Sequence, residues 1–365
     1  MTDAMTIGGL LAPAVLYGLI FLMNLLLPAR RVPGYVVDPA TGRPVSYRLN
    51  GLLVLIVALA GYLLGVELGW FAPDWLYANR WSLVAGACAV GLVYTLVLVI
   101  GQPTTGRGLL VDLFLGRLEN RTYFSRVDAK MYLYLAGAVV LALNTVSFAW
   151  HHHDVFGAEA NPGVYLHAAL LLFFVADYLI FERVHLYTYD IFAERLGFKL
   201  AWGCLVFYPF FYPVGLWSTA HLPEPGLVAS LGPLWLAGCT AVFLAGWVLA
   251  RGANLQKYAF KRFPERTFLG IEPRAVSDGD QRLLASGFWG ISRHVNYLGE
   301  ILMALGIAAS LGHLGSPWPW LYPLYYVLLL FPRERDDDRR CAAKYGPLWA
   351  EYQKAVPHRI IPGIY

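Results

Sequence analysis

The sequence predicts an all-α polytopic integral membrane protein with about nine to ten transmembrane helices. Of its 365 residues, 58% are hydrophobic and only 14% are charged, whereas a soluble globular domain has about 25% charged residues. Apolar runs long enough to cross a hydrocarbon core of about 30 Å also recur along the whole chain. No positively charged segment followed by a small-residue cleavage site opens the sequence, so we expect the first apolar run to be kept as a span.

The apolar runs define nine candidate spans. The ninth run is short and the eighth begins with polar residues, so these two runs could form a hairpin in place of two separate spans. One of the long runs could instead be divided into two spans. The nine runs lie at residues 6–27, 49–69, 82–100, 131–150, 164–181, 198–217, 226–250, 295–311 and 319–331.

The positions of Lys and Arg predict how these spans are oriented, because short cytoplasmic loops carry an excess of both residues. All 28 except Arg80 lie in the first, third, fifth or seventh connection or in the tail that follows the last span. Nine spans fit this alternation. We therefore expect a cytoplasmic C-terminus and cytoplasmic basic loops, with the N-terminus on the opposite side.

The connections are too short to hold a soluble domain. We therefore expect residues 1–365 to form a single transmembrane domain, with N-terminal helices in 1–217 and a C-terminal, ligand-binding half in 218–365. Pro and Gly in the first connection, residues 33–44, predict turns. The longest connection, residues 251–294, predicts a helix extension and a short excursion.

Two residue types that often bind metals give no strong signal. His151, His152 and His153 fall in a predicted outer loop without further ligands, so we expect no metal site. The four cysteines are scattered along the chain and form neither a disulfide framework nor a CxxC pair.

A polar cluster stands immediately before the eighth span. Arg293, His294, Asn296 and Tyr297 combine a cation, an imidazole, a carboxamide and a phenol. Together such groups can bind a phosphorylated, planar, hydrogen-bonding ligand, which indicates a nucleotide. The alternative is an ordinary interfacial belt, in which aromatic rings lie at headgroup level and basic side chains reach toward water.

A second cluster follows the seventh span. If that span continues as a helix, Asn254, Lys257 and Lys261 fall at i, i+3 and i+7 on one face. This face presents a carboxamide and two ammonium groups to an anion. Binding of these cations to anionic lipid is the alternative.

The tail contains a third charged segment. Pro332 before it and Gly346-Pro347 after it predict a helix of about thirteen residues. A solvated face with i,i+4 pairs is the alternative. Many aromatic and apolar residues follow, so we expect the end of the chain to fold back. The four charged residues that share one stripe of this helix are Arg333, Asp337, Arg340 and Lys344.

Acidic residues at membrane depth are candidate functional residues, because an acid in hydrocarbon is costly. Asp177 and Glu300 lie within predicted spans, and Glu182 lies at a boundary. A protonated or paired acid that only packs helices is the alternative. The aromatic, Pro-containing segment 207–213 could shape a cavity for a bulky apolar ligand. The chain has no GxGxxG turn and no P-loop, so side chains at helix ends would have to bind any nucleotide.

Taken together, these segments resemble the membrane sterol reductases, a family that includes the Δ14, Δ7 and Δ24(28) enzymes and the membrane domain of the lamin B receptor. The resemblance covers most of the chain, and its last three segments are together highly specific. The similar segments are Tyr47–Gly51, Phe114–Arg121, Asp177–Ile191, Asn254–Arg262, Gly287–Gly299 and Arg333–Tyr365.

The chain departs from this family at three positions. Asp336 replaces an Arg and Pro332 replaces a His on the cofactor side, and Cys204 replaces an Asp that is often found in the sixth span. The first two changes bear on how the cofactor is held. The third bears on the choice of substrate.

The resemblance implies NADPH-dependent reduction of a carbon–carbon double bond in a sterol or sterol-like lipid, with Δ14 first and Δ7 and Δ24(28) behind it. It implies a cytoplasmic NADPH pocket formed by the C-terminal helices. Asp337 is our first choice for the acid, with Asp177 and Glu182 as second choices. The residues implied to bind NADPH are Asn254, Lys257, Lys261, Arg262, Trp289, Arg293, His294, Asn296, Tyr297, Arg333 and Tyr352.

Two other classes of function stay open at this point. A membrane methyltransferase that uses S-adenosylmethionine on an isoprenoid or other lipid has a similar Arg-His-x-x-Tyr fragment. The clustered cations argue against it, because NADPH carries an extra phosphate and S-adenosylmethionine carries none. A non-enzymatic sterol-binding protein is the other alternative. We expect membrane lipid and a sterol as partners and no nucleic acid, and the sequence does not predict an oligomeric state.

Overall fold

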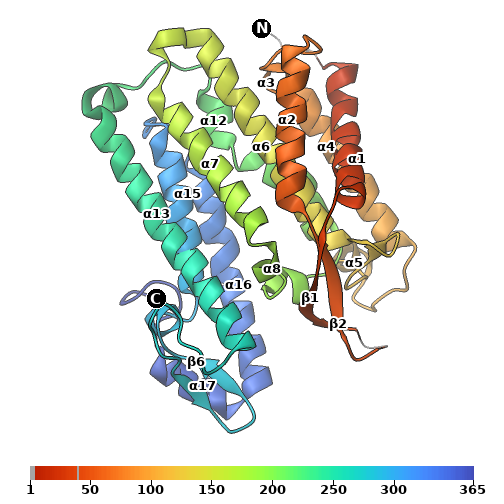
Figure 1. The fold of residues 1–365 in the computed structure, drawn as a ribbon, viewed down its shortest axis with the longest axis vertical. Helices are drawn as coiled ribbons and strands as arrows, with labels where there is room; N and C mark the ends of the chain where they lie inside the picture. The colour runs from red at the N-terminus through yellow and green to blue at the C-terminus, as the bar shows by residue number, and fades with distance from the viewer. Residues whose placement is uncertain (1–4, 39–40) are drawn as a thin grey trace. The chain divides into compact units, whose positions relative to one another are not determined.

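The computed structural model describes residues 5–38 and 41–365 (Figure 1). The chain is mostly helical and divides into two compact units, Met1–Glu224 and Pro225–Tyr365. Within the described residues, six helical segments are long and apolar enough to cross a membrane. An all-α polytopic membrane protein is therefore confirmed, whereas a count of nine or ten spans stays a prediction. The six are α1 (Ile7–Leu26), α4 (Arg80–Ile100), α6 with its 3-10 end (Ala129–Glu159), α7 (Pro162–Ile180), the segment Phe198–Thr219, and α13 (Gly226–Arg262).

Three further predicted spans also coincide with helices. The helices α2 (Gly51–Glu67) and α15 (Val295–Ser310) are apolar but shorter than the six. The ninth run forms the first part of α16 (Leu321–Tyr345). The predicted tail helix is wrong at its start, because Pro332 lies inside α16 rather than before it. Proline removes only one N–H from a helix, and the turns on either side hold it in place here.

The centre of the first unit is α6 (Ala129–Phe156), which is buried over most of its length. Asp128 begins this helix by accepting a hydrogen bond from the N–H of Met131 at 3.0 Å. The helix packs against α1, α2 and α7 and against the Phe198–Thr219 segment. That segment consists of α10 (Phe198–Trp202), a π-helical turn (Gly203–Phe207), α11 (Tyr208–Phe211) and α12 (Val214–Thr219).

The first connection is a β-hairpin, so the predicted turns are confirmed only at its tip, where the N–H of Gly42 donates to the carbonyl of Asp38 at 2.8 Å, and are wrong at Pro33 and Gly34, which lie in a strand. Strand β1 (Arg30–Val37) pairs antiparallel with β2 (Pro44–Leu49). Gly34 makes room for the ring of Tyr47, since a Cβ there would stand 2.4 Å from it. The remaining short elements of this unit are α3 (Trp75–Ala78), α5 (Leu109–Leu115), β3 (Thr122–Tyr123), β4 (Val127–Asp128), α8 (Glu182–His185) and α9 (Tyr189–Phe192).

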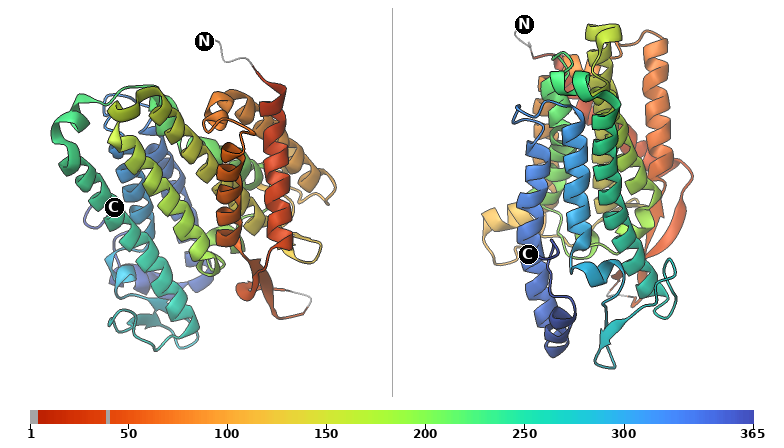
Figure 2. Two further views of the ribbon diagram at one scale, coloured as in Figure 1. Left: turned by 45° about the horizontal axis from the view of Figure 1, so that its top comes forward. Right: turned by 90° about the vertical axis from the view of Figure 1, so that its left-hand side faces the viewer.

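The second unit is built on α13, α15 and α16. In each view α13 and α15 run side by side, and α16 packs on α15 (Figures 1 and 2). Glycines allow the close approach, because a Cβ at Gly299 would stand 2.5 Å from the backbone of Gly246 and Ala250 on α13. The other elements are a hairpin of β5 (Ala275–Ser277) and β6 (Arg282–Leu284), a single turn α14 (Phe288–Ile291), and α17 (Pro347–Ala355).

The helix α13 continues to Arg262, as predicted, and is interrupted only near its start, where Gly232 has φ +43° before Pro233. The excursion that follows contains the β5–β6 hairpin and no soluble domain. The expectation of a single functional domain over 1–365 stays a prediction.

Candidate functional site

The extension of α13 places Lys257 beside an indole ring. The Nζ of Lys257 lies 4.8 Å from the centre of the Trp289 ring. Trp289 is buried, and its Nε1–H donates to the carbonyl of Ala253 at 2.8 Å. Because α13 is helical here, Asn254 and Lys261 share the face of Lys257, as the spacing predicted.

A glycine next to this ring fixes α14 against α13. Gly287 has φ +61°, and a Cβ there would stand 2.3 Å from Nε2 of Gln256. The buried Gln256 accepts a hydrogen bond from the N–H of Phe288 at 3.0 Å. Only glycine combines this backbone conformation with this close approach. Gln256 was not among the predicted site residues, although it lies in one of the resembling segments.

The end of the chain folds back onto the segment that precedes α15, as predicted. The backbone N–H groups of Arg293 and His294 donate to the carbonyls of His358 at 2.9 Å and Arg359 at 2.8 Å. The Nη1 of the buried Arg293 also donates to the carbonyls of Val356 at 2.9 Å and Pro357 at 3.0 Å. This guanidinium therefore holds the tail, and among the described residues its Nε has no hydrogen-bond partner.

His294 lies at the centre of the candidate site. Its ring stacks on Tyr297 with 4.8 Å between centres and 21° between planes. Burial, together with the charges of Lys257 and Arg293, lowers the pKa of His294 to about 3, so the imidazole is neutral near pH 7. Its buried Nε2 has no hydrogen-bond partner within the described part of the chain. This atom is available to a ligand.

Asp337 of α16 faces the same ring. Its Oδ2 lies 3.8 Å from Nε2 of His294, which is too long for a hydrogen bond. Burial raises the pKa of this carboxyl, and the charges of Lys257 and Arg340 oppose the rise without cancelling it. The balance between burial and cations, which the sequence left open, therefore shifts this carboxyl toward the protonated form relative to an exposed aspartic acid.

Ion pairs and hydrogen bonds tie α16 to the tail beside Asp337. Glu334 is fully buried and contacts Nη1 of Arg359 at 3.4 Å and the hydroxyl of Tyr365 at 3.2 Å. Asp338 accepts from Nε1 of Trp349 at 3.1 Å. Glu334, Asp338 and Arg359 were absent from the predicted site. Glu334 and Asp338 lie four residues apart on α16, and only the folded tail brings Arg359 to Glu334 and Trp349 to Asp338.

The remaining predicted C-terminal residues divide by burial. Tyr352 is buried, Asn254, Asn296 and Arg333 are partly buried, and Arg262 is exposed. The Oδ1 of Asn296 has no hydrogen-bond partner among the described residues. It offers a second unused polar atom, two residues along the chain from His294.

Asp177 and Glu182, the second-choice acids, belong to the first unit. Glu182 is buried, and its Oε2 accepts from the N–H of Gly51 at 3.1 Å. Burial raises the pKa of Glu182 to about 7. Asp177 is partly buried near the end of α7. Glu182 therefore has a structural contact of its own, which joins α8 to the start of α2.

The three consecutive histidines lie within α6, so their placement in a loop is wrong. His151 pairs with Asp74 at 3.0 Å, His152 bonds to the carbonyl of Ala220 at 2.8 Å, and His153 bonds to the hydroxyl of Tyr165 at 2.8 Å. Successive residues of a helix point in different directions, so the three rings have different partners. No group of three or more His, Cys, Asp or Glu side chains in residues 5–38 and 41–365 could hold a metal ion.

The fold and this polar cluster together define a class of protein: a polytopic helical membrane protein with a buried His, an acid and several cations gathered in its C-terminal unit. More particularly, the chain belongs to the ergosterol biosynthesis ERG4/ERG24 family, whose model matches residues 11–365. The predicted resemblance to membrane sterol reductases is confirmed. Membership makes this chain a membrane oxidoreductase of sterol biosynthesis and lipid metabolism.

Similarity to individual proteins extends over nearly the whole chain. The chain is 33% identical to the Delta(14)-sterol reductase of Arabidopsis thaliana over 98% of each sequence. It is 33% identical to the Delta(14)-sterol reductase of Methylotuvimicrobium alcaliphilum over 89% of this chain and 76% of that protein. It is also 29% identical to the probable 7-dehydrocholesterol reductase of Acanthamoeba polyphaga mimivirus, over 92% of this chain and 78% of that protein.

Proposed function

We propose that this protein reduces a carbon–carbon double bond of a sterol or sterol-like lipid and uses NADPH as the hydride donor. The relatives named as sterol reductases support the reaction class. The observation that carries the cofactor assignment is the position of Lys257 over Trp289, beside a neutral, buried His294. This arrangement offers a cation, an aromatic face and unused polar atoms at one place.

The chemistry of this cluster fits NADPH. The Nε2 of His294 and the Oδ1 of Asn296 have no hydrogen-bond partner among the described residues and suit the hydrogen-bonding groups of a nucleotide. Lys257 and Lys261 lie on one helical face and suit a phosphate. S-adenosylmethionine has no phosphate for these cations to bind. The other residues proposed to bind NADPH are Asn254, Arg262, Trp289, Arg293, Tyr297, Arg333 and Tyr352.

We assign the proton to Asp337. An unactivated alkene has to accept a proton before, or while, it accepts hydride, so the site needs an acid opposite the hydride donor. NADPH, when bound, supplies the hydride. Burial raises the pKa of Asp337, which makes a proton on it more available than on an exposed aspartic acid, and its carboxyl lies 3.8 Å from His294. Asp177 and Glu182 are the alternative acids.

We place the Δ14 double bond first as the bond reduced, on the names of the relatives from Arabidopsis and Methylotuvimicrobium. The viral relative named as a probable 7-dehydrocholesterol reductase favours Δ7 as the second candidate. Reduction at Δ24(28) comes third. Nine or ten spans, with the NADPH site and the C-terminus in the cytoplasm, complete the proposal.

One experiment tests the reaction, the bond and the cofactor together. Membranes that contain the full chain are incubated with a Δ14, a Δ7 or a Δ24(28) sterol and with NADPH or NADH, and products are measured by mass spectrometry. We expect a gain of two hydrogens on the Δ14 sterol with NADPH and little product with NADH. Equal use of the two cofactors would refute the phosphate-binding role of the cations. A methylated product with S-adenosylmethionine, or no product with any sterol, would refute the reductase assignment.

A further inference from the structure

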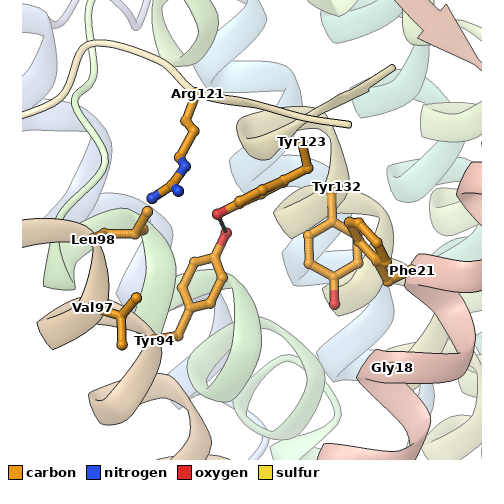
Figure 3. A pocket seen from close by; sticks show the side chains of 8 residues that line it. All are labelled: Gly18, Phe21, Tyr94, Val97, Leu98, Arg121, Tyr123 and Tyr132. Carbon is orange, nitrogen blue, oxygen red and sulfur yellow. Dashed lines mark hydrogen bonds between the residues drawn. The ribbon is translucent and has the colours of Figure 1, made fainter. Parts of the chain in front are cut away.

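The first unit contains a pocket of about 350 Å³ that has no part in the proposed reaction. It lies between the second half of α1 and the last turns of α4, and the loop that carries β3 closes one side (Figure 3). Its volume is at the small end of the range for ligand pockets, roughly 300–1,000 Å³. Because the pocket is made from two candidate spans and a basic loop, it lies at a boundary between hydrocarbon and headgroups.

The polar side of this pocket consists of hydrogen-bond donors. Arg121 and two phenols, Tyr94 and Tyr123, point toward one another (Figure 3). The two phenol oxygens are 2.8 Å apart, so one hydroxyl donates to the other and the second hydroxyl hydrogen is left for a ligand. The guanidinium of Arg121 lies 5.3 Å from the ring of Tyr123.

The charge of Arg121 is not neutralised within the described residues, in which its guanidinium has no carboxylate and no hydrogen-bond acceptor. The acids nearest in sequence serve other groups. Glu119 pairs with Arg195 at 3.2 Å, and Asp128 accepts from Asn120 at 2.5 Å and caps α6. A cation beside a spare O–H, with no acid lining the pocket, complements an anionic oxygen such as a phosphate.

The other side of the pocket is apolar and leads to surfaces that lipid tails would cover. Phe21 packs edge-on against Tyr132 with 5.2 Å between ring centres. The hydroxyl of Tyr132 points away, into a 2.9 Å hydrogen bond with the carbonyl of Tyr17, so only its ring faces the pocket. At the rim, Val97 is 64% exposed on a face of α4 that is apolar. A ligand here can place a charged group at Arg121 and a hydrocarbon chain along α4.

We propose that this pocket is a binding site for one anionic phospholipid, with the phosphate on Arg121 and the tyrosine pair and the acyl chains along α1 and α4. A phospholipid has an anionic phosphate that can neutralise the charge of Arg121. It also has acyl tails that can cover the exposed valines and leucines of α4. The proposal is independent of the NADPH and sterol assignments, because every residue it uses lies in the first unit and outside the candidate active site.

Native mass spectrometry of the detergent-solubilised full chain tests this site. The protein is mixed with equal amounts of dioleoyl phosphatidylglycerol and dioleoyl phosphatidylcholine, and the retained lipid is identified. We expect one phosphatidylglycerol to be retained in preference to phosphatidylcholine. Arg121→Gln should lower that retention roughly tenfold, as expected for loss of a charge-assisted hydrogen bond. Arg126→Gln removes an exposed charge from the same loop and should change nothing.

A second variant fills the pocket without removing charge. Gly18 lines it, and a Cβ there meets no atom within 4 Å, so Gly18→Leu should fold and block the acyl chains. Gly61→Leu is the matched control, because Gly61 is also a helical glycine with open space around its Cβ. Equal loss in Arg121→Gln and Arg126→Gln, or unchanged retention in Gly18→Leu, would overturn the proposal. So would displacement by excess inorganic phosphate, which indicates a soluble anion, or equal retention of phosphatidylcholine.

Discussion

The imidazole Nε2 of His294 lies 3.8 Å from the carboxyl Oδ2 of Asp337, although the two residues are 43 positions apart in the sequence. Burial lowers the pKa of the base, which is neutral near pH 7, and raises the pKa of the acid. Opposite pKa shifts in a neighbouring base and acid, with cations around them, are more typical of a functional site than of a structural ion pair. Asp337 is therefore the residue whose replacement should affect the chemistry most.

Asp337→Asn should bind NADPH nearly as well as the parent and lose turnover roughly a hundred- to ten-thousand-fold, because an amide keeps the size but supplies no acidic proton. In the parent, activity should fall as pH rises through the raised pKa of Asp337, since only the protonated form donates. Rates with the best sterol are compared with NADPH affinity from calorimetry. Near-normal turnover would remove Asp337 from the chemistry and leave Asp177 and Glu182 as the acids to test.

Lys257→Ala and Arg293→Ala should behave differently, although both remove a cation from the candidate site. Among the described residues the Nζ of Lys257 has no hydrogen bond or ion pair and lies over the Trp289 ring, so its loss should weaken NADPH binding roughly tenfold or more and leave the melting temperature unchanged. Arg293 donates to two tail carbonyls, so its loss should also lower thermal stability. The NADPH affinity and the melting temperature of each variant are measured on the purified protein. If Lys257→Ala binds NADPH normally, the ammonium serves only to pack on Trp289.

Glu182→Gln should change how stability depends on pH. Burial raises the pKa of Glu182 from 4.5 to about 7, so the folded state binds this proton more tightly than the unfolded state does. The resulting stabilisation is complete below pH 4.5 and is lost as pH rises to about 7. The melting temperature of the variant, relative to that of the parent, should therefore rise between pH 5 and pH 8. The exposed Glu67→Gln is the control. Parallel curves for parent and Glu182→Gln would contradict the raised pKa.

Gly299→Ala should destabilise the packing of α13 on α15. A Cβ at this position would stand 2.5 Å from backbone atoms of Gly246 and Ala250, which cannot move without shifting a helix. We expect a loss of about 1–3 kcal/mol, typical of overpacking. Gly238→Ala on α13 adds the same methyl group into open space and should cause no loss. Unfolding of both variants in a denaturing detergent measures the difference. Equal stability would show that the two helices can separate at no cost.

Composition and the spacing of apolar residues were sufficient to predict an all-α membrane protein, because a bilayer requires long apolar helices whatever the tertiary contacts are. The same is true of the continuation of α13 through Lys257 to Arg262, since no helix breaker interrupts it. The turns expected around Gly34 and the break expected at Pro332 were wrong. Strand pairing in the β1–β2 hairpin, and helical turns on both sides of Pro332, overrode the local preference of Pro and Gly.

Residue types identified His294 and Asp337 as candidates, but only the tertiary structure brought them together. Their distance depends on how α16 packs against α15, and their protonation depends on the solvent that this packing excludes. The tertiary structure also decided that Arg293 hydrogen-bonds to the tail and that Glu182 accepts a hydrogen bond from Gly51. A sequence pattern specifies which chemical groups are present at a helix end. Burial and contacts, which arise from segments far apart in the chain, decide the charge that each group carries and the partner that it binds.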